Sequence, residues 1–219
     1  MTLRLAIFDC DGTLIDSQHS IASAMQHAFE AVALPCPARA DCLSIVGLSL
    51  PEAMAQLLPE AEPAFHAAVA EHYKRAFHEL RRTGQLREPL YDGVAALLDA
   101  LEADGWLLAV ATGKSDRGLR LALEELGMFG RFVSLQTADR HPSKPHPSMI
   151  EAALADAGVA REQAVMIGDT SFDMAMACAA GVRALGVGWG YHPPEALLAA
   201  GAQSVAMDSA QLSRHIGLP

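Results

Sequence analysis

Acidic, hydroxyl and glycine residues follow three of the short apolar runs in this sequence. The residues of this kind that come directly after an apolar run are Asp9, Asp11, Thr112, Gly113, Asp169 and Asp173. If the runs are parallel strands of one sheet, their carboxyl ends lie along one edge, which is where such sheets bind ligands. We therefore expect these residues to converge on one crevice, provided that their strands are neighbours.

The carboxylates of this set suit a hard cation. Asp9 and Asp11 either point the same way from an extended backbone or flank one bound group across the turn that Gly12 permits. Close carboxylates repel one another, and a divalent cation relieves that repulsion. Asp169 and Asp173 add further oxygens, and an all-oxygen set favours Mg²⁺ over zinc. Taken singly, each pair also fits an ordinary turn or helix cap.

Two segments carry groups suited to a phosphate. Thr112 and Gly113 leave an apolar run and precede a helical pattern, and backbone N–H groups at such a turn can hold phosphate oxygens. Lys144 lies among three prolines in the segment 141–147, which fix the backbone that presents its charge. A plain strand-to-helix connection and a solvated loop lysine are the alternatives for these two segments.

The elements that must position these residues alternate along the chain. The expected strands are Leu3–Phe8, Leu107–Ala111, Phe132–Gln136, Val165–Ile167, Arg183–Val187 and Ser204–Met207. Between them, apolar residues recur at helical spacing over 94–101 and 119–126, and Pro147 can open a helix over 148–157; a glycine ends each pattern. Strands that alternate with helices are typical of a parallel sheet covered on both faces. We predict an α/β fold with a Rossmann-like three-layer core.

One region interrupts the alternation. From about residue 17 to residue 88 the sequence has helical periodicity and no convincing strand. One apolar stripe runs from Ile21 to Val32 and another from Phe65 to Leu80. We predict a helical domain of residues 17–87 inserted into a core domain of residues 1–16 and 88–219, with crossings near 15–17 and 87–91.

Composition excludes several classes of protein. The formal charge of the 219 residues is −10, which argues against a nucleic-acid partner, although a metal ion can still hold an anionic substrate. The four cysteines form no CxxC pair, so a zinc site or a disulfide framework is not expected. No apolar run approaches the ~18 residues of a membrane span, and Asp9 comes too early for a signal peptide. We expect a cytoplasmic protein without a membrane partner.

The motifs, taken together, resemble those of the haloacid dehalogenase superfamily. The matching segments are Asp9-x-Asp11-Gly12-Thr13-Leu14, Thr112, Lys144-Pro145-x-Pro147 and Gly168-Asp169-x-x-x-Asp173. Four motifs in this order are far more specific than any one of them. The helical insert is similar to that superfamily's small helical cap. Segments 46–50 and 188–191 resemble its phosphoglycolate phosphatase-like branch.

This resemblance implies a phosphatase acting on a small phosphorylated metabolite, either phosphoglycolate-like or a sugar phosphate. Asp9 would be the nucleophile that forms an aspartyl-phosphate, and Asp11 would be the general acid and then the general base. Thr112 and the Gly113 N–H would bind phosphoryl oxygens. Lys144 would offset the charge of Asp9 and of the phosphate, so that Thr112 and Lys144 belong to the catalytic and the substrate-binding set alike.

The resemblance also implies a metal and a cap loop. Mg²⁺ would be held by Asp9, the backbone carbonyl of Asp11 and Asp169, with Asp173 in support. Gly47 and Ser49 are the expected cap contacts to substrate. The protein is expected to be a monomer or a weak homodimer.

Other functions remain open on the sequence. Asp11 separates the chain from dehalogenases, which have no leaving alcohol to protonate. A β-phosphoglucomutase-like phosphosugar mutase or a non-catalytic phosphoryl-ligand binding protein is the alternative. In the insert, Arg75, Arg81 and Arg82 either recognise a second anion or lie on the surface of their helix.

Overall fold

The computed structural model describes residues 3–218, and its centre is one parallel sheet. The strands are β1 (Arg4–Phe8), β2 (Trp106–Thr112), β3 (Ser134–Thr137), β4 (Ala164–Gly168), β5 (Arg183–Val187) and β6 (Ser204–Ala206). Their order across the sheet is β3-β2-β1-β4-β5-β6, and each neighbouring pair is parallel. β1 therefore lies between β2 and β4, so the three strands that precede the candidate residues are neighbours. The predicted α/β class is confirmed.

Alternate residues of β1 build two separate hydrophobic layers. Ala6 and Phe8 pack into the cluster on one face of the sheet, and Leu5 and Ile7 pack into the cluster on the other face. All four side chains are buried. A strand covered on both faces must be apolar at every position, which is why this run carries no charge after Arg4.

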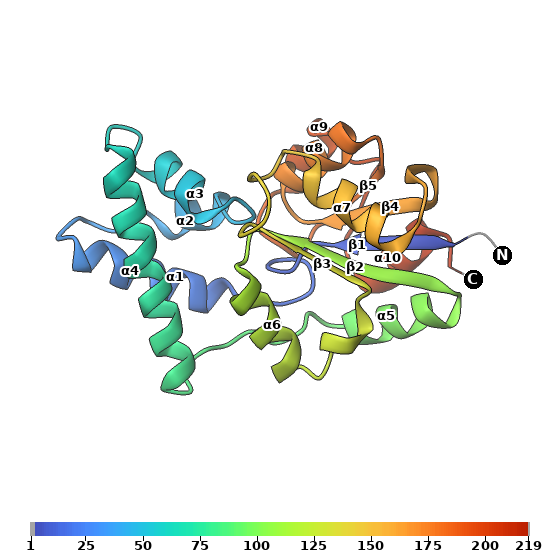
Figure 1. Ribbon diagram of the computed structural model, residues 1–219, viewed down its shortest axis with the longest axis horizontal. Helices are drawn as coiled ribbons and strands as arrows, with labels where there is room; N and C mark the ends of the chain where they lie inside the picture. Colours follow the sequence, from blue (N-terminus) through green and yellow to red (C-terminus); the bar gives the residue numbers. More distant parts are fainter. Residues whose placement is uncertain (1–2, 219) are drawn as a thin grey trace.

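Helices cover both faces of the sheet. α5 (Val94–Ala103), α6 (Asp116–Glu125) and α10 (Ser209–Ile216) contribute buried residues to one cluster. α7 (Ser148–Ala157), α8 (Ser171–Ala180) and α9 (Pro194–Ala199) contribute to the other. Figure 1 shows α7, α8 and α9 above the sheet and α5 and α6 below it. Short 3₁₀ turns at 129–131 and 161–163 complete the core.

The predicted elements differ from the observed ones mainly at their ends. β3 begins at Ser134 rather than at Phe132, because the chain leaves a 3₁₀ turn there and the Phe132 side chain packs into the core. Leu3 lies outside β1 and is half exposed. α2 (Arg39–Ser44) in the insert was not predicted, since six residues are too few to establish a helical period.

The residues between 17 and 87 form helices around a core of their own. α1 (Gln18–Ala31), α2, α3 (Leu50–Leu57) and α4 (Pro63–Arg82) enclose a cluster that includes Met25, Phe29, Met54 and Val69. Figure 1 shows these helices gathered at one end of the sheet. A separate core supports the division at residues 16/17 and 87/88, which stays a prediction.

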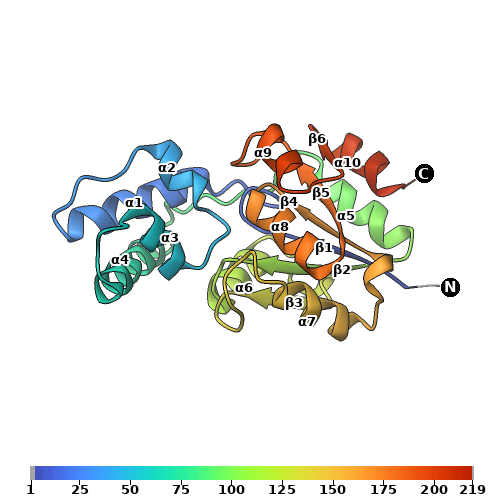
Figure 2. The same ribbon diagram turned by 90° about the horizontal axis from the view of Figure 1, so that it is seen from above.

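Two antiparallel segments connect the helices to the sheet. Ile15 bridges Leu90, and the Asp16 N–H donates to the Pro89 carbonyl over 2.8 Å. The Ser20 hydroxyl both donates to the Arg87 carbonyl (3.0 Å) and accepts from the Arg87 N–H (2.9 Å). Figure 2 shows the two connections running side by side between the helical insert and the sheet. Over residues 3–218, no helix is both long and apolar enough to traverse a bilayer.

Candidate active site at the carboxyl edge of the sheet

The ends of β1, β2 and β4 bring the candidate residues together. The Asp9 N–H donates to the Ile167 carbonyl over 2.9 Å, which extends the pairing of β1 with β4 by one residue and fixes the backbone of Asp9. The candidates buried at this edge are Asp9, Asp11, Thr112, Lys144, Asp169 and Asp173. The expected convergence is present for Asp9, Asp169 and Asp173, which lie together with Lys144, whereas the Asp11 side chain and Gly113 line a cavity beside them.

Three carboxylates form its centre. Asp9, Asp169 and Asp173 each place an oxygen within 4.8 Å of the others, and all three are fully buried. Burial raises the pKa of Asp9 to about 7; Lys144 opposes the shift, and the Asp173 and Asp11 charges add to it. Burial, with the Asp9 and Asp173 charges, likewise raises the pKa of Asp169 well above its ordinary value. Ionised carboxylates at this place therefore carry a large desolvation penalty, which a bound cation would relieve.

Asp169 is held from several directions. The Thr13 hydroxyl donates to its Oδ1 (2.8 Å), and the Tyr191 N–H donates to its Oδ2 (2.9 Å). Gly12 and Gly190 pack so closely that a Cβ on either would lie 2.2 Å from Asp169. Both positions therefore require glycine, and they explain the glycines of the two segments that flank this carboxylate.

Asp173 has two functions at once. Thr170 and Asp173 form a capping box at the start of α8, in which the Thr170 N–H donates to Asp173 Oδ2 over 3.0 Å. The other oxygen, Oδ1, accepts from the Lys144 ammonium over 2.6 Å. The helix-cap interpretation of this residue is confirmed, and its part in holding a metal stays a prediction.

Lys144 is a buried lysine and not a solvated loop residue. Its ammonium is fully buried and lies 2.8 Å from Asp9 Oδ1 as an ion pair, in addition to its bond to Asp173. Burial disfavours the charged ammonium, but the Asp173 and Asp9 carboxylates outweigh it and raise the pKa of Lys144. The lysine therefore remains charged beside the predicted nucleophile.

The carboxylate group fits a hard divalent cation. One lysine charge faces three buried carboxylates. Asp9 Oδ1 has Lys144 alone as a partner, and Asp9 Oδ2 accepts no hydrogen bond from the described part of the chain. Buried oxygens without such a partner are exceptional in native proteins and mark a site for an ion or ligand. The donors are all oxygens, as Mg²⁺ prefers. Asp9, Asp169 and Asp173 would hold such an ion.

The Asp11 side chain lies apart from that group. Lys114 Nζ donates to its Oδ1 (2.8 Å) and Oδ2 (3.1 Å), and the Ser17 hydroxyl donates to Oδ1. Lys114 also donates to Glu88 over 2.8 Å, and all three charged side chains are about nine-tenths buried. Asp11 therefore has Lys114 as its lysine partner, whereas Asp9 and Asp173 have Lys144.

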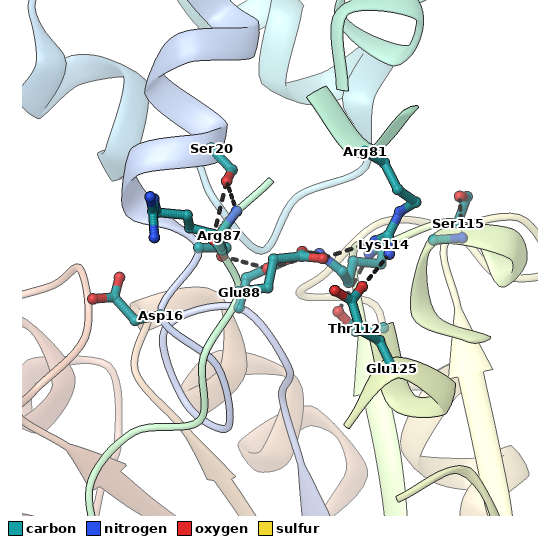
Figure 3. Close-up of polar contacts among 12 residues, drawn as sticks. Asp16, Ser20, Arg81, Arg87, Glu88, Thr112, Lys114, Ser115 and Glu125 are labelled. Atoms are coloured by element: carbon teal, nitrogen blue, oxygen red, sulfur yellow. Dashed lines mark hydrogen bonds and ion pairs between the residues drawn. The ribbon is translucent and has the colours of Figure 1, made fainter. Parts of the chain in front are cut away.

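Lys114 is the site residue to which the sequence analysis assigned no role. Its only signal in the sequence is its position two residues beyond the end of β2, directly after the Thr112–Gly113 turn. Glu88 continues the contact to Arg81 of α4 (2.8 Å), which also pairs with Glu125 of α6 (2.7 Å). Figure 3 shows the Glu88 side chain reaching Lys114, with Arg81 descending from the insert.

The turn at Thr112 and Gly113 lies against the loop of the insert that contains Gly47 and Leu48. The Lys114 N–H donates to Thr112 Oγ1 over 3.3 Å. A Cβ on Gly113 would lie 2.6 Å from the carbonyl oxygens of Gly47 and Leu48, so only glycine allows the loop to come this close. The insert therefore contacts the predicted phosphate-binding turn through its backbone.

Gly47 and Ser49 anchor this loop on the core. The Ser49 N–H donates to the Ser143 hydroxyl over 2.8 Å, and Gly47 packs against Thr170. Their neighbours Leu48 and Leu50 line a cavity of about 300 Å³ between insert and core, and Gly47 and Ser49 are not among its lining residues. A direct contact of Gly47 or Ser49 with substrate stays a prediction.

Of the three arginines considered for a second anion, only Arg81 lines the cavity. Arg82 pairs with Glu79 of its own helix on the surface (2.8 Å), and Arg75 is exposed. Arg81 alone lies at the cavity, where Glu88 and Glu125 already neutralise it. The surface interpretation is correct for Arg75 and Arg82.

Comparisons with known proteins agree with this geometry. The family model described as "Haloacid dehalogenase-like hydrolase" matches residues 6–187. The chain is 36% identical over 205 residues to "Probable phosphatase IndB" of Dickeya dadantii, covering 92% of this chain and 88% of that protein. It is 32% identical over 202 residues to "Phosphoglycolate phosphatase" of Vibrio cholerae, covering 89% and 88%.

A solved structure supports the fold. The crystal structure of a "predicted phosphatase" from Clostridium acetobutylicum superposes with a TM-score of 0.89 at 23% identity, covering 99% of both chains. The family model covers most of the chain, including all four motifs and the buried carboxylates after β1 and β4. This chain therefore belongs to the haloacid dehalogenase-like hydrolases, as one of their phosphatases.

Proposed function

We propose that the protein is a Mg²⁺-dependent phosphomonoesterase that hydrolyses a small phosphorylated metabolite through an aspartyl-phosphate on Asp9. The observation that carries this proposal is the Asp9 carboxylate, which is fully buried and has Lys144 as the partner of Oδ1, while Oδ2 has no hydrogen-bond partner in the described chain. A carboxylate in this position is available to attack phosphorus once a cation balances its negative charge.

The first step breaks the ester bond. An Asp9 oxygen attacks phosphorus, the bond from phosphorus to the alcohol oxygen breaks, and Asp11 donates a proton to that oxygen. Lys144 and the Thr112–Gly113 turn bind the phosphoryl oxygens, whose charge is the main obstacle to the reaction. Asp9, Asp169 and the Asp11 carbonyl, with Asp173 in support, would hold Mg²⁺, which would supply Lewis-acid charge neutralisation.

The second step regenerates the enzyme. Asp11 removes a proton from a water molecule, and the water oxygen attacks the phosphorus of the aspartyl-phosphate. The bond between phosphorus and the Asp9 oxygen then breaks, which releases inorganic phosphate and restores the Asp9 carboxylate. Asp11 suits this double role because its side chain lies outside the group formed by the other three carboxylates and has Lys114 and Ser17 as partners. Two carboxylates in different surroundings can take different parts in one reaction.

The Asp9→Asn variant tests the proposal, because the amide keeps the shape of the side chain and removes the nucleophile. We expect the release of phosphate from a panel of phosphomonoesters with Mg²⁺ to fall by at least about 10³-fold, and the far-ultraviolet dichroism to stay unchanged. The Asp99→Asn variant, which makes the same change on the surface of α5, serves as the matched control. EDTA is expected to stop the wild-type reaction.

Two results would contradict the proposal. Near-normal phosphate release by Asp9→Asn would exclude the aspartyl-phosphate. Conversion of one sugar phosphate into its isomer, with little free phosphate and with dependence on a bisphosphate primer, would favour the mutase instead.

A further inference from the structure

The cavity beside Asp11 points to the chemical class of the leaving group. It has a volume of about 300 Å³, lies between the insert and α6, and is lined by Asp11 and Gly113 at its inner end. We propose that it binds an uncharged, apolar alcohol part of the phosphomonoester, such as an aromatic ring on a short chain. This inference rests on the proposed phosphatase function and narrows it.

The walls of the cavity are mainly hydrocarbon. Six of the lining side chains are Ile21, Met25, Ile45, Leu48, Leu50 and Leu121. Such walls favour every buried CH₂ of a ligand and penalise a hydroxyl or carboxylate that loses its water there. A sugar or a glycolate part would be desolvated without gaining a set of hydrogen bonds.

Two aromatic rings add a preference for an aromatic occupant. Tyr73 and Phe77 of α4 line the cavity, and their ring centroids are 5.8 Å apart at a tilt of 34°. Aromatic rings in such tilted arrangements attract one another beyond the burial of area. Lys114 Nζ lies over the Phe77 ring, 5.3 Å from its centroid. The aromatic rings are therefore next to the charged residues that line the cavity.

The basic side chains at the cavity already have partners within the protein. Lys114 lies between Asp11 and Glu88, and Arg81 lies between Glu88 and Glu125. A ligand carboxylate would have to compete with these carboxylates for the same cations. These ion pairs of Lys114 and Arg81 leave little positive charge for a second anion, which is what phosphoglycolate would require.

The basic groups at the outer end are engaged as well. Lys74 pairs with Glu71 on the surface (2.7 Å), and Arg117 donates to His78 Nε2 (3.1 Å). Lys114, Arg81 and Arg117 thus contact residues across the boundary between insert and core, whereas Lys74 pairs within α4.

The volume agrees with this class of ligand. A dry engineered cavity of about 150 Å³ holds a benzene molecule, so a cavity of about 300 Å³ has room for a ring with a short chain. The two-carbon remainder of phosphoglycolate would leave most of it unfilled. Because Asp11 lines the inner end, the ester oxygen of a ring-bearing alcohol reaches the predicted general acid while the ring lies among the apolar walls.

The test compares esters of primary alcohols whose leaving groups are similarly reactive. Phosphate release with Mg²⁺ is measured for ethyl, butyl, hexyl and 2-phenylethyl phosphate, and for phosphoglycolate and glycerol 3-phosphate. We expect kcat/KM to rise about fourfold for each added CH₂ along the alkyl series. We expect 2-phenylethyl phosphate to exceed phosphoglycolate by more than about tenfold.

A variant of a wall residue tests whether the preference for apolar esters arises from this cavity. Leu121→Gln makes one partly exposed wall residue polar and keeps a good helix former in α6. We expect it to lower the ratio of kcat/KM for 2-phenylethyl phosphate over ethyl phosphate by about tenfold. Leu198→Gln makes the same change on α9, where Leu198 is 52% exposed, and is expected to leave that ratio unchanged.

The outcomes separate this inference from the proposed function. Hydrolysis with no dependence on chain length, with phosphoglycolate at or above 2-phenylethyl phosphate, or with an unchanged ratio in Leu121→Gln, would overturn the inference and leave the phosphatase in place. No phosphate release from any of the six esters by folded enzyme would overturn both.

Discussion

At the scale of single residues, two buried lysines divide the acidic side chains between them. Lys144 contacts Asp9 and Asp173, whereas Lys114 contacts Asp11 and Glu88. Asp9 and Asp11 are two positions apart in the sequence, yet their charges are balanced by different cations. This division agrees with the proposal that Asp9 acts as nucleophile while Asp11 exchanges protons.

Removal of Lys114 tests this division. The change Lys114→Met keeps an unbranched chain and leaves Asp11 and Glu88 buried without their shared cation. We expect a loss of about 3–5 kcal/mol in the free energy of unfolding, together with a fall in kcat, because an uncompensated buried charge is strongly destabilising. Urea unfolding and steady-state rates measure the two effects.

Lys74→Met is the matched control for that variant. Lys74 forms an exposed pair with Glu71, and such pairs contribute less than about 1 kcal/mol. If the two variants were equally stable and equally active, Lys114 would have no special part in the site.

At the scale of elements, the loop over residues 45–50 decides how closely the insert meets the core. The loop contacts the end of β2 through its backbone and the Ser143 loop through the Ser49 N–H. His192 Nε2, in the loop after β5, lies 2.8 Å from the Ser44 carbonyl just before it. Backbone contacts of this kind depend on the shape of both chains rather than on side-chain type.

Gly113→Ala tests the closeness of that contact. The new Cβ would lie 2.6 Å from two backbone carbonyl oxygens, and backbone cannot yield as a flexible side chain can. We therefore expect the loop to move away, kcat/KM to fall at least about tenfold, and Tm to drop by several degrees. Enzyme assays and thermal melts report these changes.

Gly130→Ala is the control, because a Cβ at Gly130 meets nothing within 4 Å. We expect Gly130→Ala to match the wild type in activity. A Gly113→Ala enzyme with full activity would mean that the loop does not need to rest on this turn during the reaction.

At the scale of the whole molecule, we expect the acidic site to make stability depend on pH and on a bound metal ion. The carboxyl of Asp9 has an ordinary pKa of 3.8 when unfolded and about 7 when buried, and burial also raises the pKa of Asp169. Below pH 4 both states hold the Asp9 proton. As pH rises toward 7 the unfolded chain releases it first, so the folded protein loses stability over this interval when no metal is bound.

Thermal melts with EDTA and with Mg²⁺ test this dependence. We expect Mg²⁺ to raise Tm more at about pH 8 than at about pH 5, because it binds the ionised carboxylates of the folded state only. Asp9→Asn serves as the control that removes the Asp9 contribution, so its Tm in EDTA should fall less across the same interval. A wild-type Tm that Mg²⁺ leaves unchanged at pH 8 would exclude a metal at this group.

The sequence by itself determined the sheet and the place of the site. Parallel strands buried on both faces must be apolar throughout, so β1, β2 and β4 stand out as runs, and Asp9, the Thr112–Gly113 turn and Asp169 follow them directly. Strand ends were less well predicted. β3 differs from its predicted range at both ends, because the competition between pairing and core packing at Phe132 has no local signal.

Only the tertiary structure decided the partners of the charges and the nature of the cavity. Lys114 meets Asp11 across 103 positions and Glu88 across 26, and no periodic pattern connects residues so far apart. Whether Arg81 faces a ligand or a carboxylate, and whether the space under the cap loop is polar or apolar, likewise depends on how the insert lies on the core. Local sequence sets which residues a strand presents at its end, whereas burial and charge pairing between distant elements set what those residues can bind.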